Sequence, residues 1–185
     1  GVCWRLVSQL SRRGQHCRLW VDDASALAWM APQMHAPAVI VGAFDDAAHA
    51  QPGDVVVEAF GCDPPPTFVE RMQQPSPPVW INLEYLGAQD YVDRSHGLPS
   101  PQASGPGAGL EKWFFFPGFT PLSGGLLRAP PTAEPAVLPL RENERAVLVF
   151  AYAHARIDTL LEALDVEPTL VLAAPGAPQA LLEPM

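Results

Sequence analysis

Short apolar runs alternate along the chain with segments of helical period, and this alternation predicts the fold. Valine-rich runs of about five residues are typical of strands, whereas apolar residues on one stripe indicate amphipathic helices. The expected strands are 17–21, 38–41, 54–58, 79–83, 113–116, 147–150 and 169–173, and the expected helices are 2–13, 25–30, about 64–74, 87–94 and about 157–164. Strands that alternate with helices predict an α/β fold with a parallel, doubly wound sheet.

A proline-rich stretch divides the sequence into two parts. Residues 126–145 carry four prolines and no clear period, so they are predicted to be a linker. We expect residues 1–125 to form an N-terminal Rossmann-like domain. Residues 146–185 are predicted to form the opening β-α-β unit of a second Rossmann-like domain.

The elements expected at the two ends of the chain predict that the sequence is a piece of a longer protein. The helix 2–13 has no strand before it, although a nucleotide-type α/β domain begins with a strand and a glycine turn. The part after the linker is near the size below which an isolated domain rarely holds a core. We therefore expect that this polypeptide lacks the first strand of its first domain and most of its second domain.

The charge and the cysteine content limit which binding partners and which cellular compartment we expect. The 185 residues carry a formal net charge of −9, and Lys112 is the only lysine. Nucleic acid and anionic membranes require a basic face, so we expect neither as a partner. The acidity fits a cationic protein partner or simple solubility. Cys3, Cys17 and Cys62 fit neither a disulfide framework nor a zinc site, and we expect a reducing, cytoplasmic setting.

Polar side chains at the end of the expected strand 79–83 are candidates for a binding site. Asn82 lies in this strand, and Glu84 and Tyr85 follow it directly. Open α/β sheets bind ligands at the carboxyl ends of their strands, so these three residues are expected to line a cleft. The alternative interpretation is a hydrogen-bond network that only fixes the loop.

Three other groups have two interpretations each. Residues 123–125, Ser-Gly-Gly, could offer backbone N–H groups to a diphosphate or form a plain turn. His96 either packs a loop or transfers a proton. Asp45, Asp46 and His49 are spaced as metal ligands could be, but their alanine-rich setting favours a solvated loop.

Several longer strings of residues indicate a family. They occupy positions 1–6, 19–23, 55–62, 79–86, 96–101, 114–119 and 123–128, and include Phe114-Phe-Phe-Pro-Gly-Phe119. In this order and at this spacing the chain resembles the EarP family of bacterial protein-arginine rhamnosyltransferases. The resemblance covers nearly the whole chain.

The resemblance implies a GT-B type glycosyltransferase of two Rossmann-like domains, the second of which binds the donor. The implied reaction is inverting transfer of rhamnose from dTDP-β-L-rhamnose to an arginine of elongation factor P, without a metal or another cofactor. A guanidinium stays protonated at neutral pH, so a carboxylate must orient it or remove a proton. The family's motif places that aspartate just before Gly1. We therefore expect no catalytic residue in this chain, and no activity from this polypeptide alone.

The resemblance also implies contacts for individual residues on the donor side. Gly1 matches the last glycine of the family's aspartate motif and is assigned to donor binding. Phe150 and Tyr152 match a donor-nucleotide segment, in which an aromatic ring can stack on thymine and a phenol can reach a phosphate. Core and rim packing of the two aromatic rings is the alternative interpretation.

On the acceptor side, the resemblance implies that Asn82, Glu84 and Tyr85 form a wall of the cleft. Glu84 would then orient the arginine by charge-assisted hydrogen bonds. Two other functions remain open from the sequence. One is a non-catalytic α/β domain that binds elongation factor P, and the other is a different sugar-nucleotide transferase of the same fold.

Overall fold

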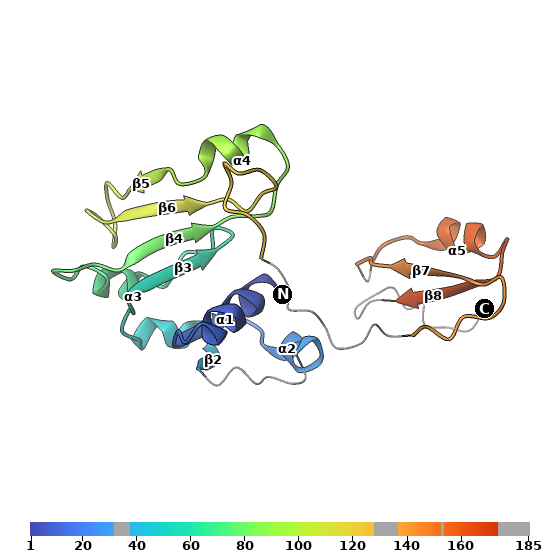
Figure 1. The fold of residues 1–185 in the computed structure, drawn as a ribbon. Helices are drawn as coiled ribbons and strands as arrows, with labels where there is room; N and C mark the ends of the chain where they lie inside the picture. Colours follow the sequence, from blue (N-terminus) through green and yellow to red (C-terminus); the bar gives the residue numbers. More distant parts are fainter. Residues whose placement is uncertain (32–37, 128–136, 153, 174–185) are drawn as a thin grey trace. The chain divides into compact units, whose positions relative to one another are not determined.

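A computed structural model of the protein describes residues 1–31, 38–127, 137–152 and 154–173. The chain divides into two compact units, Gly1–Pro131 and Thr132–Met185, and each is described by itself (Figure 1). The boundary between the units falls inside the proline-rich stretch 126–145. None of the helices in the described ranges has the length and apolarity needed to cross a lipid bilayer.

The first unit begins with a helix and a two-stranded parallel sheet. Helix α1 (Val2–Arg12) is followed by β1 (Cys17–Val21), α2 (Ser25–Met30) and β2 (Val39–Ala43). The register of the sheet pairs Cys17 with Val39 and Val21 with Ala43. Helix α1 contacts both strands. Gly14 takes a φ of +83° just after α1, in the left-handed region that glycine adopts without steric cost.

The second sheet of this unit has four strands in the order β3-β4-β6-β5 (Figure 1). Its strands are β3 (Val55–Ala59), β4 (Val79–Leu83), β5 (Pro99–Pro101) and β6 (Glu111–Phe115). The helices α3 (Pro66–Arg71) and α4 (Asp90–Ser95) connect strands of this sheet, and η1 (Phe44–His49) precedes β3. Strands β3, β4 and β6 are parallel, whereas β5 runs antiparallel to β6 at the edge. The sheet is therefore mainly parallel.

The core of the first unit lies between α3 and one face of this sheet. Buried apolar side chains from both elements meet there: Val56, Phe68, Val69, Met72, Trp80 and Leu110. Trp20 of β1 packs against them, with its ring edge-on to Phe68 at 5.7 Å between centroids. These contacts fix the strands β3 and β4, whose ends carry the candidate site.

The second unit contains a parallel β-α-β arrangement. It consists of β7 (Arg145–Val149), α5 (Asp158–Leu164) and β8 (Thr169–Ala173), with Arg145 in register with Thr169. Together with the sheets of the first unit, this arrangement confirms the predicted α/β class with mainly parallel strands.

The structure departs from the predicted fold in several respects. The strands of the first unit form two sheets rather than one, because β1 pairs with β2 and β3 with β4, and β1 and β3 do not pair. The helix expected over about 64–74 is shorter, because Pro65 is the N-cap residue of α3 and Met72 is already its C-cap residue. Residues 44–49, expected as a loop, form a short 3-10 helix. The expectation of a further strand before Gly1 stays a prediction.

Candidate functional site

The loops that follow β3, β4 and β6 are joined to one another at the carboxyl ends of these strands. The N–H of Phe60 donates to the carbonyl of Leu83 at 2.8 Å, and the N–H of Glu84 donates to the carbonyl of Phe115 at 2.9 Å. Carboxyl ends of parallel strands meet at one edge of a sheet, which is where open α/β sheets bind ligands. Side chains from three separate segments therefore gather at this edge.

Asn82 and Glu84 form a hydrogen-bonded pair at this edge. Asn82 is 5% exposed, and its Nδ2 donates to Glu84 Oε1 at 2.8 Å. Its Oδ1 accepts a hydrogen bond from the N–H of Gly61 at 3.4 Å. The predicted network that fixes the loop is thus present. Glu84 itself is half-buried, and within the described part of the chain its Oε2 has no hydrogen-bond donor.

An aromatic pair stands beside this network. The rings of Phe60 and Tyr85 are stacked, with 4.3 Å between centroids and 20° between planes. Tyr85 is 66% exposed, so much of its surface is open to solvent. Phe60 has a φ of +61°, which is unusual for a bulky residue. The sequence pattern pointed to Tyr85 but gave no sign that Phe60 would pack against it.

A buried ion pair joins Glu58, near the end of β3, to Lys112, near the start of β6. Glu58 is 3% exposed, and its carboxylate accepts hydrogen bonds from Lys112 Nζ at 2.6 Å and Trp80 Nε1 at 3.0 Å. Lys112 Nζ also lies 4.4 Å from the centre of the Trp80 ring and 3.4 Å from Asp63 Oδ1. Burial raises the pKa of Glu58, and the hydrogen bond and charge of Lys112 offset only part of this effect.

Neither member of this pair was among the predicted site residues. Glu58 is the member of the pair that the sequence could have indicated, because it stands at an inward position of the alternating strand Val55–Ala59. A carboxylate at a buried strand position requires a partner. The partner could not be read from the sequence, since Lys112 lies 54 residues farther along.

Replacing Trp80 with Phe should lower the free energy of unfolding by about 1–3 kcal/mol, because a buried carboxylate oxygen loses its donor. The 3.0 Å bond from Trp80 Nε1 is the contact that disappears. Urea denaturation followed by circular dichroism measures the change. Trp113→Phe is the matched control, since Trp113 is 39% exposed. An equal, small effect of both substitutions would contradict the assigned contact.

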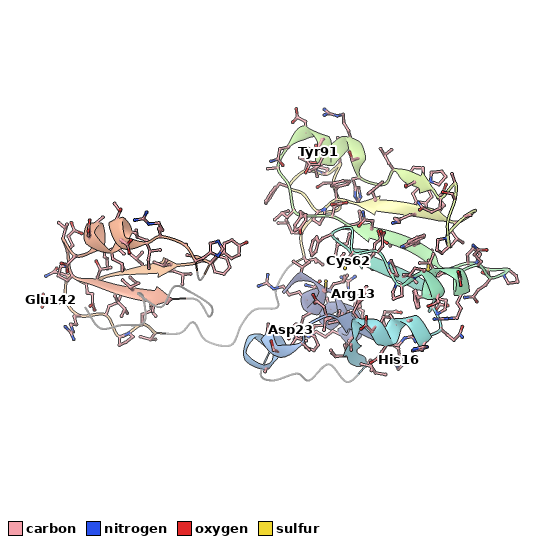
Figure 2. The ribbon with its side chains drawn as sticks, turned by 180° about the vertical axis from the view of Figure 1, so that it is seen from behind. Arg13, His16, Asp23, Cys62, Tyr91 and Glu142 are labelled. Atoms are coloured by element: carbon pink, nitrogen blue, oxygen red, sulfur yellow. The ribbon has the colours of Figure 1, made fainter. Side chains whose placement is uncertain are left out.

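Gly1, predicted to bind the donor, is the N-cap residue of α1, and its carbonyl accepts a hydrogen bond from the N–H of Arg5 at 3.2 Å. Burial raises the pKa of the Cys3 thiol, and the charge of a Cys62 thiolate adds a smaller effect in the same direction. Cys62, labelled in Figure 2, follows the turn at Phe60 and Gly61.

The other two predicted donor residues belong to the second unit. Phe150 and Tyr152 follow β7 and are 87% and 77% exposed. The ring of Tyr152 lies parallel to that of His154, with 5.7 Å between centroids. Both aromatic side chains are thus at the surface of their unit and not in its core.

His96 and Gly124 both make packing contacts in the structure. His96 Nδ1 accepts a hydrogen bond from the N–H of Phe116 at 3.2 Å, and its ring lies edge-on to Phe115. The N–H of Gly124 donates to the carbonyl of Phe116 at 2.8 Å, so it belongs to a turn. A Cβ at Gly124 would lie 2.5 Å from the Phe115 ring, which explains the glycine. In the described ranges, no three His, Cys, Asp or Glu side chains could together hold a metal ion.

These features define an α/β protein of Rossmann-like type, with polar and aromatic side chains gathered at the carboxyl ends of parallel strands. A family model described as "Elongation-Factor P (EF-P) rhamnosyltransferase EarP" matches residues 1–182. The chain belongs to the EarP family.

Individual relatives agree with this assignment. The chain is 48% identical over 138 residues to a protein-arginine rhamnosyltransferase of Pseudomonas putida, an alignment that covers 69% of this chain and 36% of the relative. It is 37% identical over 206 residues to that of Pseudomonas aeruginosa, covering 95% and 54%. The protein of the same name from Neisseria meningitidis serogroup B is 38% identical over 138 residues, covering 69% and 35%. The chain thus spans about a third to a half of these relatives' length.

Proposed function

We propose that the chain is the acceptor-side unit, with the opening of the donor-side unit, of a GT-B type protein-arginine rhamnosyltransferase. The observation that carries this proposal is the half-buried carboxylate of Glu84, which is held by Asn82 and directly precedes the exposed Tyr85 in the chain. The name shared by the relatives supports the reaction class, and the family description supports elongation factor P as the acceptor.

The arrangement suits the side chain of an arginine. A guanidinium is planar, stays charged and donates hydrogen bonds to a carboxylate, and its faces stack on aromatic rings. Glu84 has one carboxylate oxygen bonded to Asn82 and a second that can accept from the guanidinium. Tyr85, backed by Phe60, supplies the stacking face. In this proposal Glu84 and Tyr85 hold and orient the nucleophile, and neither of them performs the proton transfer.

We propose that the proton transfer belongs to an aspartate that the family resemblance places before the position of Gly1. Such a carboxylate can remove a proton from the guanidinium as its nitrogen attacks.

For the donor we propose dTDP-β-L-rhamnose, transferred with inversion in the cytoplasm and without a metal or another cofactor. Phe150 and Tyr152 are exposed directly after the first strand of their unit, where a Rossmann-like domain receives a nucleotide. One of their rings can cover the thymine base, and the phenol of Tyr152 can bond a phosphate.

The test is the mass of elongation factor P after incubation with dTDP-β-L-rhamnose and either this chain or a version extended to the length of its relatives. The extended protein should add one rhamnose to the acceptor, and this chain should add none. An acceptor whose arginine is replaced with lysine is the control. An unmodified acceptor with the extended, folded protein would contradict the proposal, and modification by this chain would contradict its inactivity.

A non-catalytic domain that binds elongation factor P is the second candidate function. The same pocket favours it, because Asn82, Glu84 and Tyr85 need no general base to retain an arginine. Retention of the acceptor by the extended protein, without any transfer from the donor, would favour this function over the enzyme.

A further inference from the structure

The turn that carries Phe60 is held in a conformation that its residue type disfavours. Phe60 and Gly61 have φ values of +61° and +70°, and the N–H of Cys62 closes the turn by donating to the carbonyl of Ala59 at 3.2 Å. Glycine accepts a positive φ freely, whereas a phenylalanine there is strained by its Cβ. Such strain persists where the surrounding structure over-determines the backbone, and it is concentrated at functional sites.

Contacts from β4 and the segment after it hold one side of this turn. The N–H of Phe60 donates to Leu83, and the N–H of Gly61 donates to Asn82 Oδ1. The ring of Phe60 is stacked on Tyr85. All three contacts come from the segment Leu83–Tyr85 and its neighbour Asn82, so they join the turn to the proposed arginine pocket.

Lys112 holds the other side. Its Nζ lies 2.6 Å from Glu58 Oε1 and 3.4 Å from Asp63 Oδ1, and these two residues flank the turn in the sequence. Glu58 is itself fixed by Trp80 Nε1, and the ammonium group rests over the Trp80 ring. An ammonium group has three donors, so a single side chain can bond both carboxylates. Lys112 thus ties the end of β3 to the residue that leaves the turn.

We propose that Lys112 is a positioning residue, which holds the turn after β3 so that Phe60 stacks on Tyr85 and completes the wall of the pocket beside Glu84. The ligand class of this wall, the guanidinium of a protein arginine, rests on the proposed function. The positioning itself does not depend on it. Lys112 touches no substrate in this arrangement and acts through Asp63, Glu58 and Phe60.

A purely structural role for Lys112 is the competing explanation, in which it only neutralises the buried Glu58. The double variant Glu58→Gln, Lys112→Met separates the two roles, because it leaves no unpaired charge in the core and keeps similar side-chain volumes. Asp63→Ala is the second variant, since the Asp63 side chain is 81% exposed and its loss removes only the outer end of the bridge. Asp54→Ala, an exposed carboxylate just before β3, is the matched control.

The experiment is fluorine NMR of the whole chain labelled with 3-fluorotyrosine. The sequence has three tyrosines, Tyr85, Tyr91 and Tyr152, so three resonances are expected and can be assigned by Tyr→Phe substitution. The ring current of Phe60 shifts the Tyr85 resonance, and Phe60→Ala gives its position without the stack. The double variant should move Tyr85 most of the way to that position, and Asp63→Ala should move it part of the way.

The other two resonances and the Asp54→Ala spectrum should match the parent. An unmoved Tyr85 resonance in a folded double variant would overturn the proposal, as would a Phe60→Ala spectrum identical to the parent. If the double variant does not fold, the Asp63→Ala spectrum decides by the same criterion.

A kinetic measurement on the extended protein links the turn to acceptor binding. Asp63→Ala should raise KM for elongation factor P several-fold while kcat and KM for the donor change little. A moved Tyr85 resonance with unchanged acceptor KM would leave the positioning role intact and contradict the proposed arginine pocket. The two proposals can therefore fail separately.

Discussion

Replacing Lys112 with Met should lower the free energy of unfolding of the first unit by about 3–5 kcal/mol at pH 7, because it leaves Glu58 as an unpaired buried charge. The side chain of Glu58 is 1% exposed, so water cannot replace the lost ammonium group. Urea unfolding followed by tryptophan fluorescence measures the loss. All five tryptophans lie in the unit Gly1–Pro131, so their emission reports on that unit.

The deficit of Lys112→Met should shrink as the pH is lowered toward 5. Burial already raises the pKa of Glu58 above its ordinary value of 4.5, and removing Lys112 takes away a group that lowers it. A carboxyl group whose pKa is higher in the folded than in the unfolded protein binds a proton more readily in the folded state. Protonation of this group therefore stabilises the folded state at low pH. That effect is lost as the pH rises from about 4.5 through the folded pKa.

The control for this prediction is the double variant Glu58→Gln, Lys112→Met. Replacing both members of a buried pair by neutral groups of similar volume costs far less than removing one. The double variant should therefore be closer to the parent in stability than Lys112→Met is. Equal stability of Lys112→Met and the parent at pH 7 would show that the pair is not buried in solution.

Replacing Glu84 with Gln should lower kcat/KM for elongation factor P by about 10- to 100-fold in the extended protein, because a hydrogen bond to a charged group contributes about 1.5–3 kcal/mol. The substitution keeps the oxygen that accepts from Asn82 Nδ2, so the loop should retain its conformation. Steady-state kinetics with varied acceptor measure the effect, and KM for the donor should not change.

Glu70→Gln is the matched control for Glu84, since Glu70 is an exposed glutamate on α3. It should leave kcat/KM within twofold of the parent. Equal kinetics of the Glu84→Gln variant and the parent would remove Glu84 from the acceptor pocket.

The sequence located the main elements because their signals are local. Apolar runs marked 17–21, 79–83 and 169–173, and the structure has strands over the same residues. Strand β5 was missed, since Pro99 and Pro101 break the usual strand pattern. They are tolerated there because β5 is an edge strand, where proline need not donate to a neighbour.

The candidate site was predictable only in part, because the sequence reveals only local signals. Asn82, Glu84 and Tyr85 are adjacent in sequence at the end of one strand, so their common location followed from the strand itself. The contact between Glu58 and Lys112 depends on which strands are neighbours in the sheet. The stacking of Phe60 depends on a positive φ that no residue type signals. Tertiary pairing and backbone strain therefore set the limits of prediction.

Binding of elongation factor P to this chain, measured by titration calorimetry, tests the central claim that the pocket at Glu84 receives the acceptor arginine. The parent chain should bind the factor, and binding should weaken about tenfold or more both for the Glu84→Gln variant and for a factor whose arginine is replaced with lysine. The two changes combined should weaken binding little beyond either one, since they remove the same contact. Equal affinities in all four combinations, or no binding by the parent chain, would contradict the claim.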